Sequence, residues 1–395
     1  MNDRERRVLT EELTRMGFTS DGSPPAAPPA EASGRASREP QPRAPEPRAV
    51  ERVADARGVA PPNASHRPAP PATRDRPWTR PTAESLTPDT VLRPQRKKPA
   101  RGWRRVLYTL TGGAVNRGPS PAELRVIQLE SRARSPIKGC HRVAIISLKG
   151  GVGKTTTTAA LGSMFASLRG DRVIAVDANP DRGTLAEKVA RQNQATVRDL
   201  LADRSSIQRY SDVRDYTSQS LSRLEVLASD SDPGVSSAFS ESDYRAVVEV
   251  LERYYSLVLT DCGTGLLHSA LQGALALADS LIVVSSPSLD GARSASATLD
   301  WLEAHDYRDL ARNAIAVINS VSPGKTDVDL SRLQQHFGAR CRGVMMIPYD
   351  PHLAAGAAID IEELNRVTRN AYLELAALVA DGFSARSLQA TSASG

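Results

Sequence analysis

From Arg142 onward, short apolar runs alternate with longer stretches of helical periodicity. Runs of four or five apolar residues have the length of strands that are buried on both faces. Helical stretches separate them, for example at 244–254, 266–278, 292–303 and 361–379. The predicted strands are Val143–Ser147, Val173–Val176, Leu224–Leu227, Leu257–Thr260, Ser280–Val284, Ala314–Ile318 and Val344–Ile347. This alternation predicts an α/β fold: a mostly parallel twisted sheet with helices on both faces.

The region before residue 100 has a different composition. It holds 18 of the 27 prolines of the chain, and alanine, arginine, serine and glutamate fill much of the rest. A segment so poor in aromatic residues buries too little apolar surface to offset the entropy of ordering it. We therefore expect a disordered Pro/Ala/Arg-rich tail at 1–100, a basic helical linker at 101–140, a folded domain at 141–385 and a disordered C-terminal tail at 386–395.

Charge divides the chain in the same way. Residues 1–140 hold 26 Lys and Arg against 15 Asp and Glu, a net +11, and the remaining residues hold 25 against 30, a net −5. A basic tail is compatible with contacts to DNA, to anionic lipid or to an acidic protein surface, and also with a solvated linker. The sequence has no apolar run of about 18 residues and no apolar signal-peptide core, which predicts a cytoplasmic protein without a transmembrane segment.

The segment 143–156 carries the strongest chemical signal. It reads Val-Ala-Ile-Ile-Ser-Leu-Lys-Gly-Gly-Val-Gly-Lys-Thr-Thr, a predicted strand that runs through a glycine-rich turn into a predicted helix. Glycines let the backbone curl around phosphate with its N–H groups inward, and the helix N-terminus adds partial positive charge. This pattern predicts a P-loop in which Lys154 reaches the β- and γ-phosphates of ATP and Thr155 offers its hydroxyl to Mg²⁺. The expected nucleotide-binding residues of the loop are Lys149, Gly150, Gly151, Val152, Gly153, Lys154, Thr155 and Thr156.

Two of the predicted strands close on an acid. Asp177 follows the strand 173–176, and Asp261 follows the strand 257–260. Ligands bind where the carboxyl ends of parallel strands meet, so both acids are expected beside the P-loop. An apolar strand that ends on aspartate is the Walker B arrangement, and we expect Asp261 to bind Mg²⁺, usually through water.

The P-loop departs from the general pattern, because Leu148 stands where the first glycine is expected and Lys149 follows it. This form resembles the deviant Walker A motif of the MinD/ParA group of P-loop ATPases, over about residues 141–383. The resemblance implies that Lys149 reaches across an ATP-dependent sandwich homodimer to the phosphates of the other subunit. It also implies that Asp177 orients the attacking water and helps to hold Mg²⁺. Cys262 is a departure, since family members more often have proline there.

Two later segments extend this resemblance. In the family, an asparagine at the position of Asn319 hydrogen-bonds the adenine, and Ile347-Pro348-Tyr349-Asp350 is similar to an Ile-Pro-x-Asp segment near the base. Asn319, Pro348 and Asp350 are therefore expected to contact the nucleotide. The stretches GWRRVLYTLTGGAVNRGPSPAEL at 102–124 and VDANPDRGTLAEK at 176–188 resemble an EspI-like subgroup of MinD-family ATPases linked to type VII secretion systems of actinobacteria.

The resulting hypothesis is a regulatory Mg²⁺-dependent ATPase that dimerises with ATP. It would meet a protein partner of a secretion apparatus and reach the inner face of the membrane through that partner. One alternative is a DNA-partition ATPase, which the acidic folded part disfavours unless the basic tail supplies the contacts. Another is a non-enzymatic adaptor that uses the Pro-rich tail. The presence of Lys149, Lys154, Asp177 and Asp261 argues against an inactive site.

Overall fold

The computed structural model describes residues 109–111, 118–179, 183–230, 239–265, 268–324 and 326–383. The tails predicted at 1–100 and 386–395 lie outside the described residues. Within the described part, the chain forms an eight-stranded sheet with strand order β3-β4-β2-β5-β1-β6-β7-β8. The strands are β1 (His141–Ile146), β2 (Val173–Ala178), β3 (Thr217–Gln219), β4 (Glu225–Leu227), β5 (Leu257–Cys262), β6 (Ser280–Ser285), β7 (Ile315–Asn319) and β8 (Gly343–Ile347).

Neighbouring strands are parallel throughout the sheet, except that β3 pairs antiparallel with β4 at one edge. The predicted α/β fold is therefore confirmed. Strand β3 was not among the predicted strands, because Thr217–Gln219 is only three residues long and polar. A strand this short has no apolar run and no alternation to reveal it.

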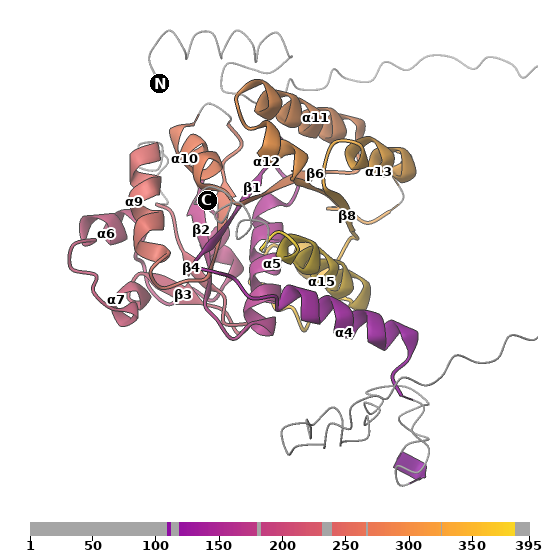
Figure 1. Ribbon diagram of the computed structural model, residues 1–395, viewed down its shortest axis with the longest axis horizontal. Helices are drawn as coiled ribbons and strands as arrows, with labels where there is room; N and C mark the ends of the chain where they lie inside the picture. The colour runs from indigo at the N-terminus through magenta and orange to yellow at the C-terminus, as the bar shows by residue number, and fades with distance from the viewer. Residues whose placement is uncertain are drawn as a thin grey trace, which may run out of the picture. The chain divides into compact units, whose positions relative to one another are not determined.

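Helices cover both faces of the sheet (Figure 1). They are α4 (Pro121–Ala133), α5 (Lys154–Leu168), α6 (Val197–Ala202), α7 (Tyr210–Arg214), α9 (Glu241–Leu251), α10 (Ser269–Leu277), α11 (Leu289–Ala304), α12 (Arg308–Arg312), α13 (Leu330–Gly338), α14 (Pro351–Ala354) and α15 (Arg366–Ala380), with a 3-10 helix, η2, at Leu185–Lys188. Over the described residues, each helix is too short or too polar to cross a bilayer.

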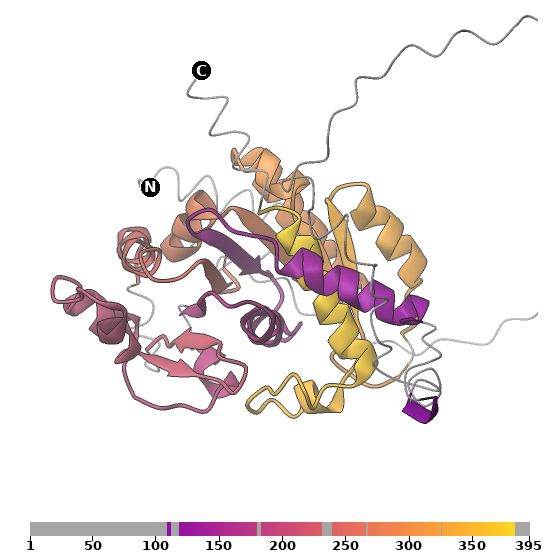
Figure 2. The same cartoon turned by 60° about the horizontal axis from the view of Figure 1, so that its bottom comes forward.

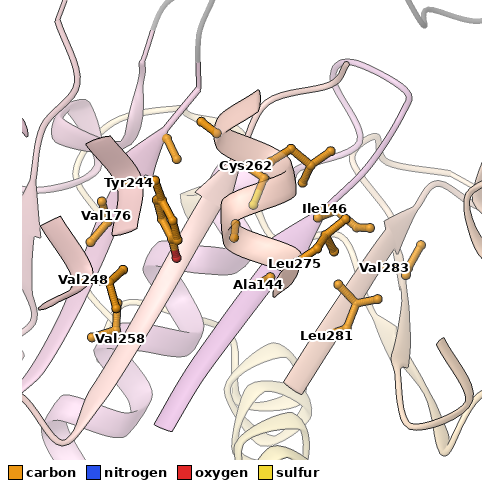
Figure 3. Close-up of a cluster of buried hydrophobic side chains, with 14 of the residues drawn as sticks. Ala144, Ile146, Val176, Tyr244, Val248, Val258, Cys262, Leu275, Leu281 and Val283 are labelled. Carbon is orange, nitrogen blue, oxygen red and sulfur yellow. The ribbon is translucent and has the colours of Figure 1, made fainter. Parts of the chain in front are cut away.

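Alternate residues of each central strand belong to opposite layers of the core. In β1, Val143 and Ile145 belong to the same buried cluster as residues of α5 and α15, and Ala144 and Ile146 belong to the cluster that includes residues of α9, α10 and α11. Figure 3 shows part of the second layer, in which side chains of β1, β2, β5 and β6 form one buried cluster with side chains of α9 and α10. The buried hydroxyl of Tyr244 shares a 2.7 Å hydrogen bond with Thr260 Oγ1. This bond fixes α9 over β5, next to Asp261.

The ends of several helices differ from the predicted ranges. Helix α9 begins at Glu241, three residues early, because Ser240 and Asp243 form a capping box that supplies the first N–H groups with acceptors. Helix α5 ends at Leu168 with Arg169 in an extended conformation. Glycine often ends a helix in the left-handed conformation, but Gly170, which follows Arg169, is not left-handed.

Helix α4 lies alongside α15 (Figure 2). Arg125 pairs with Glu374 at 2.5 Å, and Arg132 pairs with Asp381, also at 2.5 Å. Both pairs join residues 249 positions apart, so the two helices run parallel in the same register. Leu129 is buried in the same core layer as α15. The folded unit therefore includes the helix that precedes β1.

We predict that the buried face of α4 contributes to stability and that its exposed face does not. Leu129→Ala should lower the free energy of unfolding by about 2–4 kcal/mol, because it removes a buried side chain and leaves a cavity. Leu124→Ala on the same helix, where the side chain is 52% exposed, should change it by less than about 0.5 kcal/mol. Urea unfolding of both variants measures the difference, and equal effects would contradict the packing described.

Candidate functional site

The loop between β1 and α5 is bent by two left-handed glycines. Gly151 has φ of +74° and Gly153 has φ of +86°. A Cβ atom on Gly153 would lie 2.1 Å from Asn319 Nδ2, so a larger residue would collide with β7. A Cβ on Gly150 or Gly151 would meet no atom within 4 Å. The loop is therefore close-packed at its end and open along its middle, where a ligand can approach the backbone.

Helix α5 presents an uncapped N-terminus to a cavity of about 460 Å³. The N-cap residue is Gly153, which has no side chain that could accept a hydrogen bond from the first turn of the helix. The first N–H groups of a helix have no intrahelical acceptor, and they carry partial positive charge. The whole segment 149–156 lines the cavity. This geometry suits an anion such as a polyphosphate.

Asp261 ties the start of α5 to β5. Its Oδ1 accepts a hydrogen bond of 2.6 Å from Lys154 Nζ, and its Oδ2 accepts one of 2.6 Å from the Thr155 hydroxyl. Asp261 is fully buried and Lys154 nearly so. Hydroxyl and carboxylate oxygens are ligands that Mg²⁺ prefers, and the ammonium group matches a phosphate. The donor set fits a magnesium–nucleotide complex.

Asp177 lies beside Asp261, as its register partner in the neighbouring strand β2. The strand continues to Ala178, so Asp177 lies inside it and is buried. Its carboxylate accepts hydrogen bonds from Asn179 N at 3.1 Å and Leu185 N at 3.0 Å. Burial, and then the charge of Asp261, raise the pKa of Asp177 to about 7. A carboxyl group with this pKa can exchange a proton near neutral pH.

Lys149 is held apart from Lys154 and Asp261. Its Nζ lies 3.9 Å from Asp290 Oδ2 in the first turn of α11, and both side chains are partly exposed. The hydroxyl of Ser147 accepts a hydrogen bond from Lys149 N and donates one to Lys149 O. The backbone at Lys149 is therefore braced, while its ammonium group lies at the rim of the cavity in a weak surface ion pair.

Asn319, Pro348 and Asp350, which are expected to contact the adenine, all line the cavity. The side chains of Asn319 and Asp350 also form hydrogen bonds with backbone groups. Asn319 donates to Val152 O at 3.0 Å, which joins the end of β7 to the P-loop. Asp350 accepts from His352 N at 3.0 Å and from Asn365 N at 2.9 Å. Asp350 therefore closes the segment 350–365, which we call the base-side loop. It also explains why 361–365, expected to be helical, precede α15 as a turn.

Several residues that line the same cavity were not predicted from the sequence: Asn179, Thr184, Lys188, Leu353 and Gly356. The first three belong to the stretch 176–188, which includes the end of β2 and carries part of the family resemblance. No motif marks them individually. Their proximity to the P-loop depends on long-range packing, which a single sequence does not reveal.

A parallel strand that leads through left-handed glycines into a helix, whose first turn binds an acid on the adjacent strand, defines a P-loop nucleotide-binding domain. Residues 143–360 match the family model of the CobQ/CobB/MinD/ParA nucleotide binding domain. The chain belongs to this family, as its motifs predicted.

The chain is 40% identical over 285 residues to the ESX-1 secretion-associated protein EspI of Mycobacterium tuberculosis. That match covers 72% of this chain and 42% of the relative, so it spans less than half of EspI. The chain is also 29% identical over 183 residues to the septum site-determining protein MinD of a Synechocystis species, covering 46% of this chain and 65% of that one. The predicted EspI-like similarity is confirmed.

Solved structures of MinD proteins are also similar to the chain. The cell division ATPase MinD of Pyrococcus furiosus matches with a TM-score of 0.49 and 20% identity, over 62% of this chain and 99% of that one. MinD of Pyrococcus horikoshii, solved in complex with Mg-ADP, matches with a TM-score of 0.47 and 21% identity, over 60% and 94%.

We predict that the paired acids make stability depend on pH. The pKa of Asp177 is about 7 in the folded protein, and that of an unfolded aspartate is about 4. The stabilising contribution of its proton is therefore complete below about pH 4 and lost as the pH rises through about 7. The quantity to compare is the free energy of unfolding of the wild type minus that of Asp177→Asn, measured in EDTA without nucleotide. Between about pH 4 and about pH 7, this difference should fall by at most about 4 kcal/mol.

Chemical denaturation at each pH measures this difference. Asp215→Asn, at an exposed position, is the control and should give a difference that hardly changes with pH. An equally flat profile for Asp177→Asn would show that the two acids do not share a buried, proton-holding environment.

Proposed function

We propose that the chain is a Mg²⁺-dependent regulatory ATPase that dimerises with ATP and acts in secretion. The observation that carries the proposal is the double hydrogen bond from Lys154 and Thr155 to Asp261, at 2.6 Å each. These two bonds bring the ammonium group of Lys154, which would bind phosphate, next to the Thr155 hydroxyl and the Asp261 carboxylate, which would bind Mg²⁺. All three groups lie beside the uncapped N-terminus of α5. These are the parts that phosphoryl transfer requires, since its catalysis is mainly positioning and charge stabilisation.

In the proposed reaction, water attacks the γ-phosphorus of ATP, and the bond to the bridging oxygen breaks to give ADP and phosphate. The N–H groups of 150–156 and the ammonium of Lys154 hold the phosphates. Thr155 and Asp261, with help from Asp177, would hold Mg²⁺, which when bound neutralises charge on the phosphate oxygens. Asp177 orients the attacking water, and its pKa of about 7 suits a proton acceptor at neutral pH.

The adenine end of the nucleotide would lie against a second part of the cavity wall, which we call the base-side wall. Asn319, Pro348 and Asp350 line this part of the cavity. The bond from Asn319 to the P-loop keeps this wall at a fixed distance from the phosphate end. The proposal assigns these residues to the adenine, in agreement with the family resemblance.

Lys149 supports the dimer proposal. Its side chain is one-third exposed, and its ammonium group lies 3.9 Å from Asp290 Oδ2. An exposed ion pair of this kind contributes less than about 1 kcal/mol, so Lys149 can exchange Asp290 for a more highly charged partner. The triphosphate of a second subunit would be such a partner, and contact in trans would stabilise the transferred phosphoryl group.

The 40% identity to a secretion-associated protein supports a role in secretion, and the family resemblance points to a type VII system. We infer that the ATPase works in the cytoplasm, where ATP is available, and reaches the membrane through a protein partner of the secretion apparatus. The net charge of −5 after residue 140 is unfavourable for nonspecific DNA binding by the folded domain.

We predict that purified protein hydrolyses ATP and that this activity requires Asp177. Asp177→Ala should lower kcat about 100-fold or more, since it removes the group that orients the water. Glu374→Ala, an acid on α15 that does not line the cavity, is the control and should keep the wild-type rate. Phosphate release with Mg²⁺–ATP measures both. Equal background release from all three proteins would favour the adaptor alternative.

We predict further that ATP drives dimer formation through Lys149. Light scattering after size-exclusion chromatography should give a dimer for the wild type with ATP and a monomer without it. In Lys149→Ala the dimer should weaken at least about tenfold, because the phosphates lose a charged contact from the second subunit. Lys138→Ala removes an exposed lysine away from the cavity and should behave as the wild type. A monomer under all conditions would exclude the sandwich dimer.

A further inference from the structure

Two walls of the cavity come from distant parts of the sheet. One wall is η2, which follows β2, and the other is the base-side loop, which follows β8. Strands β5, β1, β6 and β7 separate β2 from β8 in the sheet. In Figure 2 the golden base-side loop nevertheless extends toward the magenta and pink segments around β2. Hydrogen bonds between Lys188 and the base-side loop join the two walls.

Lys188, the last residue of η2, makes this contact with both its side chain and its backbone. Its Nζ donates a hydrogen bond to Gly356 O, and its carbonyl oxygen accepts one of 3.0 Å from Ile359 N. Burial lowers the pKa of the Lys188 ammonium, and a hydrogen bond strengthens where water is partly excluded. Gly356 has φ of +75°, which turns the loop back at the point of contact.

The opposite end of η2 is bound to Asp177. Leu185, its first residue, donates its backbone N–H to Asp177 Oδ2 at 3.0 Å. The four residues of η2 therefore connect the carboxylate of Asp177 at one end with the base-side loop at the other. A shift of the loop that pulls Lys188 would move the donor that orients Asp177.

The base-side loop can transmit such a shift because it is cross-linked by its own hydrogen bonds. Asp350 closes its two ends, and His352 Nε2 accepts from Asp360 N at 2.9 Å. Apolar packing also holds the two walls together, since Ile359 and Ile361 belong to the same buried cluster as Leu185. Loss of the Lys188 side-chain bond would therefore loosen the connection without unfolding either wall.

We propose that Lys188 is a positioning residue that couples the base-side loop to the orientation of Asp177. The inference rests on the proposed ATPase function and deepens it. Contacts between the adenine and the base-side loop would then stabilise the conformation in which the carboxylate of Asp177 is oriented toward the attacking water. Because a displacement of about 1 Å at a reacting group can cost 100-fold in rate, a connection of this kind ties turnover to correct base binding.

The test compares Lys188→Met, which keeps the length of the side chain but removes its donor, with Lys188→Arg, which keeps a donor. We expect Lys188→Met to lower kcat for ATP about tenfold, with KM changed less than about threefold, because Asp177 is misaimed while the phosphate contacts remain. Lys188→Arg should recover most of the loss. Lys138→Met is the control for removing a lysine elsewhere.

Hydrogen exchange of the same variants without nucleotide gives a readout that does not depend on turnover. In Lys188→Met, the amides of Leu185 and Ile359 should exchange about tenfold faster than in the wild type, with other segments unchanged. Unchanged exchange and unchanged kcat would overturn the proposal, as would equal losses of kcat and thermal stability in the Met and Arg variants. A wild type without ATPase activity but with the expected exchange change would refute the proposed function and leave the connection supported.

Discussion

The buried carboxylate of Asp261 is the interaction on which the rest of the site depends. A carboxylate within a packed sheet is costly unless its oxygens are paired. Lys154 and Thr155 bind one oxygen each, and both belong to the first turn of α5. Satisfying Asp261 therefore also fixes where α5 begins, and the preceding loop must reach that point through the left-handed Gly151 and Gly153. One set of hydrogen bonds determines the positions of β5, α5 and the loop together.

A second level of organisation comes from polar side chains that bind backbone around the cavity. Ser147 braces Lys149, Asn319 holds Val152, and Asp350 closes the base-side loop. Each of these side chains lies at or just beyond a strand end, where parallel strands leave their last backbone groups without a ladder partner. The walls are therefore held by hydrogen bonds within the chain itself, and such preorganisation reduces the entropy lost when a flexible molecule is bound.

The sequence was sufficient for the parts of the structure that are encoded locally. The strands are contiguous apolar runs, and the strand, turn and helix around Lys154 lie within about 30 adjacent residues, so the fold class and the P-loop segment follow directly. Other features depend on partners that are remote in the chain. Lys188 and Gly356 are 168 residues apart, and nothing near Lys188 indicates its partner. The contacts of Asn319 and Asp350 with backbone are equally invisible to a motif, which records only residue type and order.

The parallel pairing of α4 with α15 has a mechanical consequence. The matched ion pairs show that the start of α4 and the end of α15 lie at opposite ends of one helix pair. At 1.5 Å per residue, they are separated by about 15 Å along the helix axes. A force applied between the two flanking segments would load the helix pair in shear. Every contact along the pair would then resist together, instead of opening one after another from a single end.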